Sequence, residues 1–261
     1  MCANPAPDTL PSRAKGAVRH RKVAVNAIHP TALLNGDVTL GSGNSIGPYA
    51  VITGPVVIGD DNWIGAGAVI GAPPEVRSFE HPRGDSATQG SDGVRIGNRN
   101  VIREYAQVHA GWKATTTIGD DTFIMNQVYV AHDCVIDDGA TFASSVLLAG
   151  HAHIGAGANL GLGTAVHQFR TIGRGAMIGM SSAVTRDIPP FAKAFGNPAV
   201  VRGANVIGME RSGIDPELID TLKRIYHGET GAEASDAIED PELRGAVAAW
   251  MSQRAERGDR A

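Results

Sequence analysis

An apolar residue recurs at every sixth position along most of this 261-residue chain. The first run has eight aliphatic steps: Ile28, Leu34, Leu40, Ile46, Ile52, Ile58, Ile64 and Ile70. A short second run holds Ile96, Ile102 and Val108. The third has twelve apolar steps: Ile118, Ile124, Val130, Ile136, Phe142, Leu148, Ile154, Leu160, Val166, Ile172, Ile178 and Val184. A period of six fits neither an amphipathic helix nor a long alternating strand, so it predicts a short strand and a turn, repeated many times.

The residues between the apolar steps suit tight corners. Glycine often follows the apolar residue, as in Ile58-Gly59 and Ile118-Gly119, where it allows unusual backbone angles or close approach. Polar pairs such as Asp120-Asp121 then suit an exposed turn. The composition agrees, because 33 glycines and an aromatic content of only 5% indicate a core of small repeated units.

This pattern resembles the hexapeptide-repeat superfamily, whose members form a left-handed parallel β-helix of triangular section with three hexads per coil. The resemblance implies a mainly β fold over residues 23–190, with about eight coils stacked at about 4.8 Å per strand. The alternative is an ordinary β-sandwich in which the spacing is coincidental.

Two segments interrupt the repeat, at residues 71–94 and 109–116. Loops that leave a rigid repeat often carry binding groups, although a tolerated surface insertion is the alternative for each. Residues 1–22 are expected to be a disordered N-terminal extension, with a transit peptide as the alternative. Asp215-Pro216 and Asp240-Pro241 each pair an N-cap residue with a proline at the first helical position, so residues 191–261 are predicted to be a small C-terminal helical segment.

Charge and composition exclude several classes of protein. The formal net charge of −4 argues against a protein that coats nucleic acid. No apolar run is long enough for a membrane span, and the first 22 residues lack the apolar stretch of a secretory signal. Two cysteines, Cys2 and Cys134, cannot make a disulfide framework, so a reducing, cytoplasmic location is expected.

Five histidines lie in or beside the hexads: His109, His132, His151, His153 and His167. Any one of them could simply pack in the core or lie on the surface. Zinc needs at least three converging ligands, and the zinc-binding hexapeptide proteins, the gamma-class carbonic anhydrases, use two histidines five residues apart, which these five do not provide. No metal is therefore predicted. Acid/base chemistry needs only one imidazole in a cleft, with a pKa near about 6.5.

Local motifs favour acid/base chemistry, because they resemble the UDP-N-acetylglucosamine O-acyltransferases of lipid A biosynthesis. The motifs are Ala131-His132-Asp133-Cys134, Leu148-Ala149-Gly150-His151, Val166-His167-Gln168-Phe169, Asp187-Ile188-Pro189-Pro190, Gly196-Asn197-Pro198-Ala199 and Arg202-Gly203-Ala204-Asn205, with a further Gly-x-x-Arg at Gly208–Arg211. The resemblance covers roughly residues 24–225.

The resemblance implies transfer of a 3-hydroxyacyl group from acyl carrier protein to the 3-hydroxyl of UDP-N-acetylglucosamine or a similar nucleotide sugar. His132 would be the general base, Asp133 or a backbone carbonyl would orient its ring, and the N–H of Gly150 would stabilise the oxyanion. Because the phosphopantetheine thioester is already activated, no further cofactor is expected. The residues matching His151, His167 and Gln168 would line a cleft between subunits of a homotrimer.

Departures from the family pattern leave the acceptor open. Tyr129 stands where the family carries a second histidine, and Arg211-Ser212 stands where it carries an arginine pair. Glu75 and Arg77 loosely match an acidic-x-Lys pattern and are expected to contact the acceptor, and Asn205 and Arg211 are also counted as substrate-binding.

Met180 occupies the position that sets acyl-chain length in the family, where glycine leaves a deep groove. It therefore predicts a preference for shorter acyl chains, with ordinary packing as the alternative. The acyl carrier protein is acidic, so a local basic dock is expected among Arg170, Arg174, Arg186, Lys193, Arg202, Lys223 and Arg224, unless these are scattered solvated cations.

Two other functions compete with this one. The first is a related hexapeptide acyltransferase that acts on a different amino sugar or a specialised metabolite, possibly at nitrogen or from acyl-CoA. The second is a non-catalytic hexapeptide scaffold or a metal-dependent anhydrase. The joint presence of His132, Gly150, His167 and Gln168 argues against a scaffold.

Overall fold

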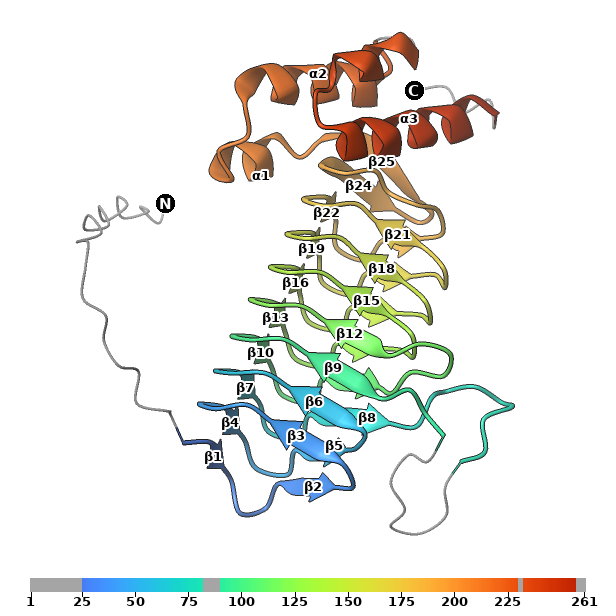
Figure 1. The fold of residues 1–261 in the computed structure, drawn as a ribbon. Coiled ribbons are helices and arrows are strands. Elements are labelled where there is room, and N and C mark those ends of the chain that lie inside the picture. Colours follow the sequence, from blue (N-terminus) through green and yellow to red (C-terminus); the bar gives the residue numbers. More distant parts are fainter. Residues whose placement is uncertain (1–24, 82–89, 230–231, 257–261) are drawn as a thin grey trace, which may run out of the picture.

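The computed structural model describes residues 25–81, 90–229 and 232–256. The chain forms a left-handed parallel β-helix of triangular section, closed at its C-terminal end by helices (Figure 1). Each strand from β1 to β20 pairs in parallel with the strand three further along the chain, and a C-terminal hairpin, β24–β25, adds to one of the resulting sheets, so the three sheets have ten, eight and seven strands. The expected fold class is confirmed. The expected N-terminal extension, residues 1–22, lies outside the described residues.

The three sheets are the three faces of the prism. The ten-stranded sheet holds β1 (Ala27–Ile28), β4 (Ser45–Ile46), β7 (Trp63–Ile64), β10 (Val101–Ile102), β13 (Phe123–Ile124), β16 (Thr141–Phe142), β19 (Asn159–Leu160), β22 (Met177–Ile178), β24 (Ala192–Gly196) and β25 (Ala199–Ala204). The eight-stranded sheet holds β2 (Leu33–Asn35), β5 (Val51–Thr53), β8 (Val69–Ala72), β11 (Gln107–His109), β14 (Tyr129–Val130), β17 (Leu147–Leu148), β20 (Ala165–Val166) and β23 (Ala183–Val184). The seven-stranded sheet holds β3 (Val38–Leu40), β6 (Val56–Ile58), β9 (Val94–Ile96), β12 (Thr116–Ile118), β15 (Val135–Ile136), β18 (His153–Ile154) and β21 (Thr171–Ile172).

The hexad residues form the core because each one points into the prism and stacks on its counterpart in the next coil. Ile46 pairs with Ile64, and Phe142 pairs with Leu160, so like surfaces are buried against each other. From Ile46 to Val184 the hexad residues are at most 2% exposed. In the first described coil Ile28 is 42% exposed, because none of the described residues forms a coil beneath it.

A ladder of asparagines runs up the early coils inside the prism. The side-chain oxygen of Asn44 accepts the N–H of Asn62, and that of Asn62 accepts the N–H of Asn100, each at 2.9 Å. Asn100 in turn accepts the N–H of Thr122 at 2.8 Å. Since buried polar groups need partners, the ladder satisfies corner amides that the β pairing leaves over.

The C-terminal segment differs from the expectation at its start. Residues 192–204 were predicted to lie in a helical segment, but β24 and β25 form an antiparallel hairpin that pairs with β22. The reason is an alternation of period two: Ala192 and Ala194 are buried, whereas Lys193 and Phe195 are exposed. The hairpin covers the open edge of the last coil, which would otherwise expose unpaired backbone groups.

Helices follow the hairpin and lie on the end of the prism (Figure 1). They are α1 (Val206–Arg211), α2 (Pro216–His227), a 3-10 helix η1 (Ala232–Ala237) and α3 (Pro241–Glu256). The carboxylates of Asp215 and Asp240 accept N–H groups in the first turns of α2 and α3, as the two Asp-Pro pairs predict. No helix in the described ranges is long and apolar enough to cross a membrane.

The two interruptions of the repeat leave the prism between β8 and β9 and between β11 and β12. They contact each other through an antiparallel bridge, in which the N–H of Gly111 donates to the carbonyl oxygen of Gly93 and the N–H of Asp92 donates to that of Gly111. A Cβ on Gly111 would lie 1.8 Å from the carbonyl oxygen of Ala114, so the shorter loop can only turn there with glycine. The two insertions therefore form one structure beside the prism.

Candidate active site

One edge of the prism gathers most of the predicted catalytic residues. The corners after β14, β17 and β20 lie one above the other, because Tyr129 pairs with Leu147 and Leu147 with Ala165 at intervals of 18 residues. The same register brings two sets of side chains into vertical columns. The first column is His132, Gly150 and Gln168, and the second is Asp133, His151 and Phe169.

The corner backbone sets where the second column points. Asp133, His151 and Phe169 all have φ close to +60° (60°, 62° and 59°), a conformation that few L-residues adopt readily. The third residue of many other corners has the same conformation, as Asp121 does with φ 57°. The backbone of the site is therefore the ordinary corner of the repeat, and its side chains are what distinguish it from the other corners.

Asp133 is buried and held by the shorter insertion. Its Oδ1 atom accepts the N–H groups of Trp112, Lys113 and Ala114 at 2.9, 2.8 and 2.7 Å. Its own N–H donates to the Thr116 hydroxyl at 2.9 Å. This loop exists because the coil before the site is longer than usual: Gln107 pairs with Tyr129, 22 residues on, instead of 18.

These contacts fix the charge of Asp133. Burial by itself raises the pKa of this carboxyl group, but hydrogen bonds from His132 and from the N–H groups of Ala114, Lys113 and Trp112 outweigh burial and hold the pKa below its usual value. The side chain has no exposed surface. Asp133 is therefore a buried carboxylate at neutral pH.

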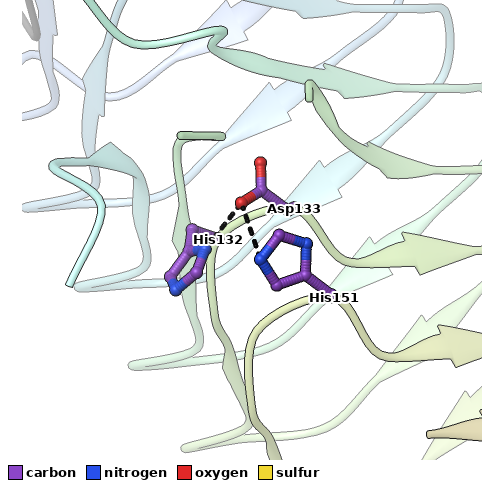
Figure 2. A group of neighbouring side chains, drawn as sticks. All are labelled: His132, Asp133 and His151. Carbon is purple, nitrogen blue, oxygen red and sulfur yellow. Dashed lines mark hydrogen bonds and ion pairs between the residues drawn. The ribbon is translucent and has the colours of Figure 1, made fainter. Parts of the chain in front are cut away.

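His132 is oriented by that carboxylate. Its Nδ1 lies 2.7 Å from Oδ2 of Asp133, and Figure 2 marks this hydrogen bond with a dashed line. Because an ionised carboxylate can only accept, Nδ1 carries the hydrogen and the neutral ring leaves a lone pair on Nε2. The ring is 14% exposed, and its neighbours are Trp112 and His151, both edge-on to it. This arrangement suits a general base.

Gly150 lies directly against the imidazole of His132. A Cβ added to Gly150 would lie 2.6 Å from Cε1 and 2.7 Å from Nε2 of the ring, so no other residue fits without moving the base. Within the described ranges the N–H of Gly150 donates to no protein acceptor. A free backbone donor thus stands beside the basic nitrogen, which is what an oxyanion site requires.

His151 contacts the same carboxylate and adds a third side chain that could bind a metal ion. Its Nε2 lies 3.4 Å from Oδ2 of Asp133, a contact drawn as a dashed line in Figure 2. Its ring stacks on that of Phe169 with centroids 4.4 Å apart. His132, Asp133 and His151 are the one group in the described part of the chain whose ligand atoms lie near enough together to hold a metal ion.

The donor atoms of this group are largely committed to hydrogen bonds. Oδ1 of Asp133 is surrounded by three N–H groups, and the Nδ1–Oδ2 separation of 2.7 Å is a hydrogen-bond distance with one proton between the atoms. A metal bound to Nδ1 and Oδ2 would have to displace that proton, so the residues present fit a hydrogen-bonded pair better than a metal centre.

The Cys134 thiol, next to Asp133, does not add a nucleophile. Cys134 is buried and free, and its Sγ donates to the carbonyl oxygen of Ala149 at 3.4 Å. Burial raises the pKa of the Cys134 thiol to about 12. It is therefore a neutral packing residue at physiological pH.

Two of the residues predicted to bind the acceptor substrate, Tyr129 and Glu75, lie next to His109. Tyr129 lies in β14, three residues before His132, and its ring contacts that of His109 with centroids 5.2 Å apart. Glu75, in the long insertion, has Oε1 3.7 Å from Nε2 of the same histidine. Arg77 is exposed on that insertion.

The remaining predicted residues do not all reach His132 within one chain. His167 and Gln168 are exposed at the corner after β20, two coils beyond that of His132 on the same edge. Met180 is 69% exposed and follows β22, which belongs to a different face of the prism. Asn205 has a structural role, because it caps α1 through Gly208 and donates to the carbonyl oxygen of Gly175, and Arg211 is exposed at the end of that helix.

Sequence reasoning missed the residues that support the site. His109 was named among five histidines but was assigned no role, and Trp112, Lys113 and Ala114 were not singled out. A usable signal was present, since the four extra residues between Gln107 and Tyr129 fall in the coil that stacks directly on the His-Asp corner.

Two family models match the chain. The model described as UDP N-acetylglucosamine O-acyltransferase, domain 2, matches residues 187–244, which include the hairpin and α2. The model described as bacterial transferase hexapeptide (six repeats) matches residues 115–150, which include His132 and Gly150.

Curated relatives match over part of their length. An acyl-[acyl-carrier-protein]–UDP-N-acetylglucosamine O-acyltransferase of Thiobacillus denitrificans is 42% identical over 149 residues, which is 54% of this chain and 58% of the relative. A protein of the same name from Burkholderia multivorans is 46% identical over 134 residues, 50% of this chain and 51% of the relative. The chain thus spans only slightly more than half the length of these curated relatives.

Solved structures give longer matches. LpxA from Acinetobacter baumannii aligns with a TM-score of 0.67 and 30% identity, over 90% of this chain and 96% of that one. UDP-N-acetylglucosamine acyltransferase from Arabidopsis aligns with a TM-score of 0.63 and 28% identity, over 92% and 96% of the two chains. With the prism, its helical end and the family-matched motifs all present, the chain belongs to the UDP-N-acetylglucosamine O-acyltransferase family.

Proposed function

We propose that this protein is an acyltransferase that moves a (3-hydroxy)acyl group from acyl carrier protein to the 3-hydroxyl of UDP-N-acetylglucosamine or a similar nucleotide sugar. The names of the relatives support the donor and acceptor. The observation that carries the proposal is the hydrogen-bonded pair of His132 and Asp133 with the imidazole against Gly150. It supports the proposal because the N–H of Gly150, which has no acceptor among the described residues, lies beside the imidazole.

The reaction follows from these groups without a covalent enzyme intermediate. Nε2 of His132 removes the proton from the acceptor hydroxyl while that oxygen attacks the thioester carbonyl carbon. The carbonyl oxygen becomes an oxyanion and accepts the N–H of Gly150. The C–S bond then breaks, and Nε2–H of His132 returns the proton to the departing thiolate. Asp133 stays ionised and stabilises the imidazolium.

The substrate assignments extend this proposal. Glu75, Arg77 and Tyr129 bind the acceptor sugar, and His151, His167 and Gln168 line the cleft along the same edge. Met180 follows β22 on another face of the prism, and Asn205 and Arg211 lie at the two ends of α1. These three residues join the site in a homotrimer, where an edge of one chain meets a different part of its neighbour. Met180 then shortens the acyl groove. A soluble acyl carrier protein as donor implies a cytoplasmic enzyme.

A direct assay tests the proposal. The protein is incubated with 3-hydroxyacyl carrier proteins of several chain lengths and a panel of sugar nucleotides, and the products are identified by mass. We expect an O-acylated sugar nucleotide and free carrier thiol. Loss of a base should lower kcat by about 10²–10⁴, so a fully active His132→Ala variant would contradict the mechanism.

Tyr129 favours one alternative acceptor. A phenol in place of the family's histidine changes the donor and acceptor atoms next to the base, so a different amino sugar, acylated at nitrogen or from acyl-CoA, is the second candidate. Amino-sugar nucleotides and acyl-CoA donors belong in the same panel. Activity that survives metal chelation, in protein with no metal by elemental analysis, would remove the metal-dependent alternative raised by His132, Asp133 and His151.

A further inference from the structure

His109 is a buried histidine that the proposed chemistry does not use. It ends β11, where the pairing with β8 shifts register between Val108 and His109, so that His109 lies opposite Ala72. A bulge of this kind turns a side chain away from its regular direction and is common beside active sites. His109 is only 7% exposed, although it lies where the long insertion leaves the prism.

One ring nitrogen of His109 anchors that insertion. Nδ1 lies 2.9 Å from the carbonyl oxygen of Pro73, in the first residues of the loop. A carbonyl oxygen only accepts, so Nδ1 carries a hydrogen, and in the neutral tautomer that this bond selects Nε2 holds a lone pair. The tautomer of His109 is thereby fixed by its backbone contact.

The other ring nitrogen faces Glu75 without bonding it. Nε2 is buried and has no hydrogen-bond partner in the described part of the chain. Oε1 of Glu75 lies 3.7 Å away, and the Glu75 side chain is 49% exposed. Two acceptors cannot share a hydrogen bond, so a neutral His109 leaves the Glu75 carboxylate available to a donor from outside.

We propose that His109 is a positioning residue for acceptor recognition: it holds the start of the long insertion against the prism and presents the Glu75 carboxylate beside Tyr129 to a hydroxyl or amide N–H of the acceptor sugar. This inference rests on the proposed function, since it concerns the acceptor of that reaction. The contacts that carry it are the Pro73 hydrogen bond, the buried Nε2 and the ring contact with Tyr129.

Two amide substitutions separate the roles of the two nitrogens. His109→Asn keeps a donor near the position of Nδ1 and so keeps the bond to Pro73. His109→Gln places an amide near the position of Nε2, loses the Pro73 bond and can donate to Glu75. We expect His109→Gln to raise KM for UDP-N-acetylglucosamine about tenfold, with kcat and the donor KM changed by less than about threefold, and His109→Asn to stay within about threefold of the parent.

The matched control is His153→Gln, which changes an exposed histidine on another face, hydrogen-bonded to Asp137. We expect its kinetic constants to match those of the parent. The positioning role would be overturned if His109→Gln and His109→Asn raised the acceptor KM equally, or if the substitutions lowered only kcat.

A double-mutant cycle tests whether His109 acts through Glu75. Glu75→Gln alone should raise the acceptor KM, and adding His109→Gln should raise it by less than about twofold more, because the group being positioned has already been changed. Independent, multiplicative effects of the two substitutions would overturn the inference.

A measurement without catalysis keeps this inference separate from the proposed function. Hydrogen–deuterium exchange of the peptide that covers residues 73–81 should be faster in His109→Gln than in the parent and in His153→Gln, because the loop loses its anchor. If the parent transfers no acyl group to any acceptor, the proposed function fails, while unchanged exchange in His109→Gln overturns the anchoring role by itself.

Discussion

Asp121 and Asp133 occupy the same corner position of the repeat, on two different edges of the prism, and have nearly the same backbone conformation, with φ 57° and 60°. Asp121 is 56% exposed and pairs with Arg99, which lowers its pKa through a hydrogen bond. Asp133 has no exposed side-chain surface and pairs with His132 and three N–H groups. The repeat supplies an identical corner to both, and the insertion beside Asp133 makes the difference, because it replaces water around the carboxylate with fixed donors.

The largest expected effect comes from removing the proposed general base, His132, from the corner that holds Asp133. His132→Ala should lower kcat by up to about 10⁴-fold with little change in melting temperature, because the ring is partly exposed and its loss leaves no large cavity. Steady-state acyl transfer and thermal unfolding measure the two quantities. His153→Ala, on another face, is the control, and an equal kinetic loss there would contradict the assignment.

Asp133→Asn should lower kcat by about 10³-fold, whereas Asp121→Asn should leave it unchanged. The three loop N–H groups would keep the amide oxygen, so the new NH2 group would face Nδ1 of His132. The ring would then carry its hydrogen on Nε2, which is the wrong tautomer for a base. A nitrogen-15 NMR spectrum of the histidines reports the tautomer, and an unchanged tautomer in Asp133→Asn would contradict this explanation.

Gly150→Ala should lower kcat by about 10²-fold. The new Cβ would meet the His132 ring at 2.6 Å and push both the ring and the substrate carbonyl away from the N–H of this residue. Gly245→Ala is the matched control, because nothing lies within 4 Å of a Cβ at that helical position. If the two variants have equal kcat values, the imidazole does not need its contact with Gly150.

The smallest effect is on stability at acid pH. The pKa of Asp133 is lower in the folded protein than in the unfolded chain, so its carboxylate stabilises the fold above the unfolded pKa, near about 3.9. This contribution should be lost as the pH falls through the lower folded pKa. Urea titrations from pH 7 to pH 3 should therefore show a steeper loss of unfolding free energy in the parent than in Asp133→Asn, and parallel curves would contradict the prediction.

The residues that hold the site in place were harder to predict from the sequence than His132, Asp133 and Gly150 themselves. His132 and Asp133 are adjacent in the sequence, and Gly150 follows His132 by the 18 residues of one coil, so the repeat alone places these three together. The hydrogen bond of His109 to Pro73 joins residues 36 positions apart across an insertion, and no periodicity extends over that distance. The hairpin at residues 192–204 was not predicted either. The two Asp-Pro helix signals lie further along the chain, and the helical prediction was extended from them back to residue 191.

The prism follows from the sequence alone, because an apolar residue at every sixth position can be buried only by stacking on its own counterparts in the neighbouring coils. The sequence also shows which corner carries the imidazole, the carboxylate and the glycine. The charge of Asp133, the tautomers of His132 and His109 and the availability of Glu75 depend instead on how the chain folds in three dimensions. Those properties depend on donors and acceptors that the two insertions bring from distant positions, and hydrogen bonding at that range follows the path of the loops, which the repeat does not specify.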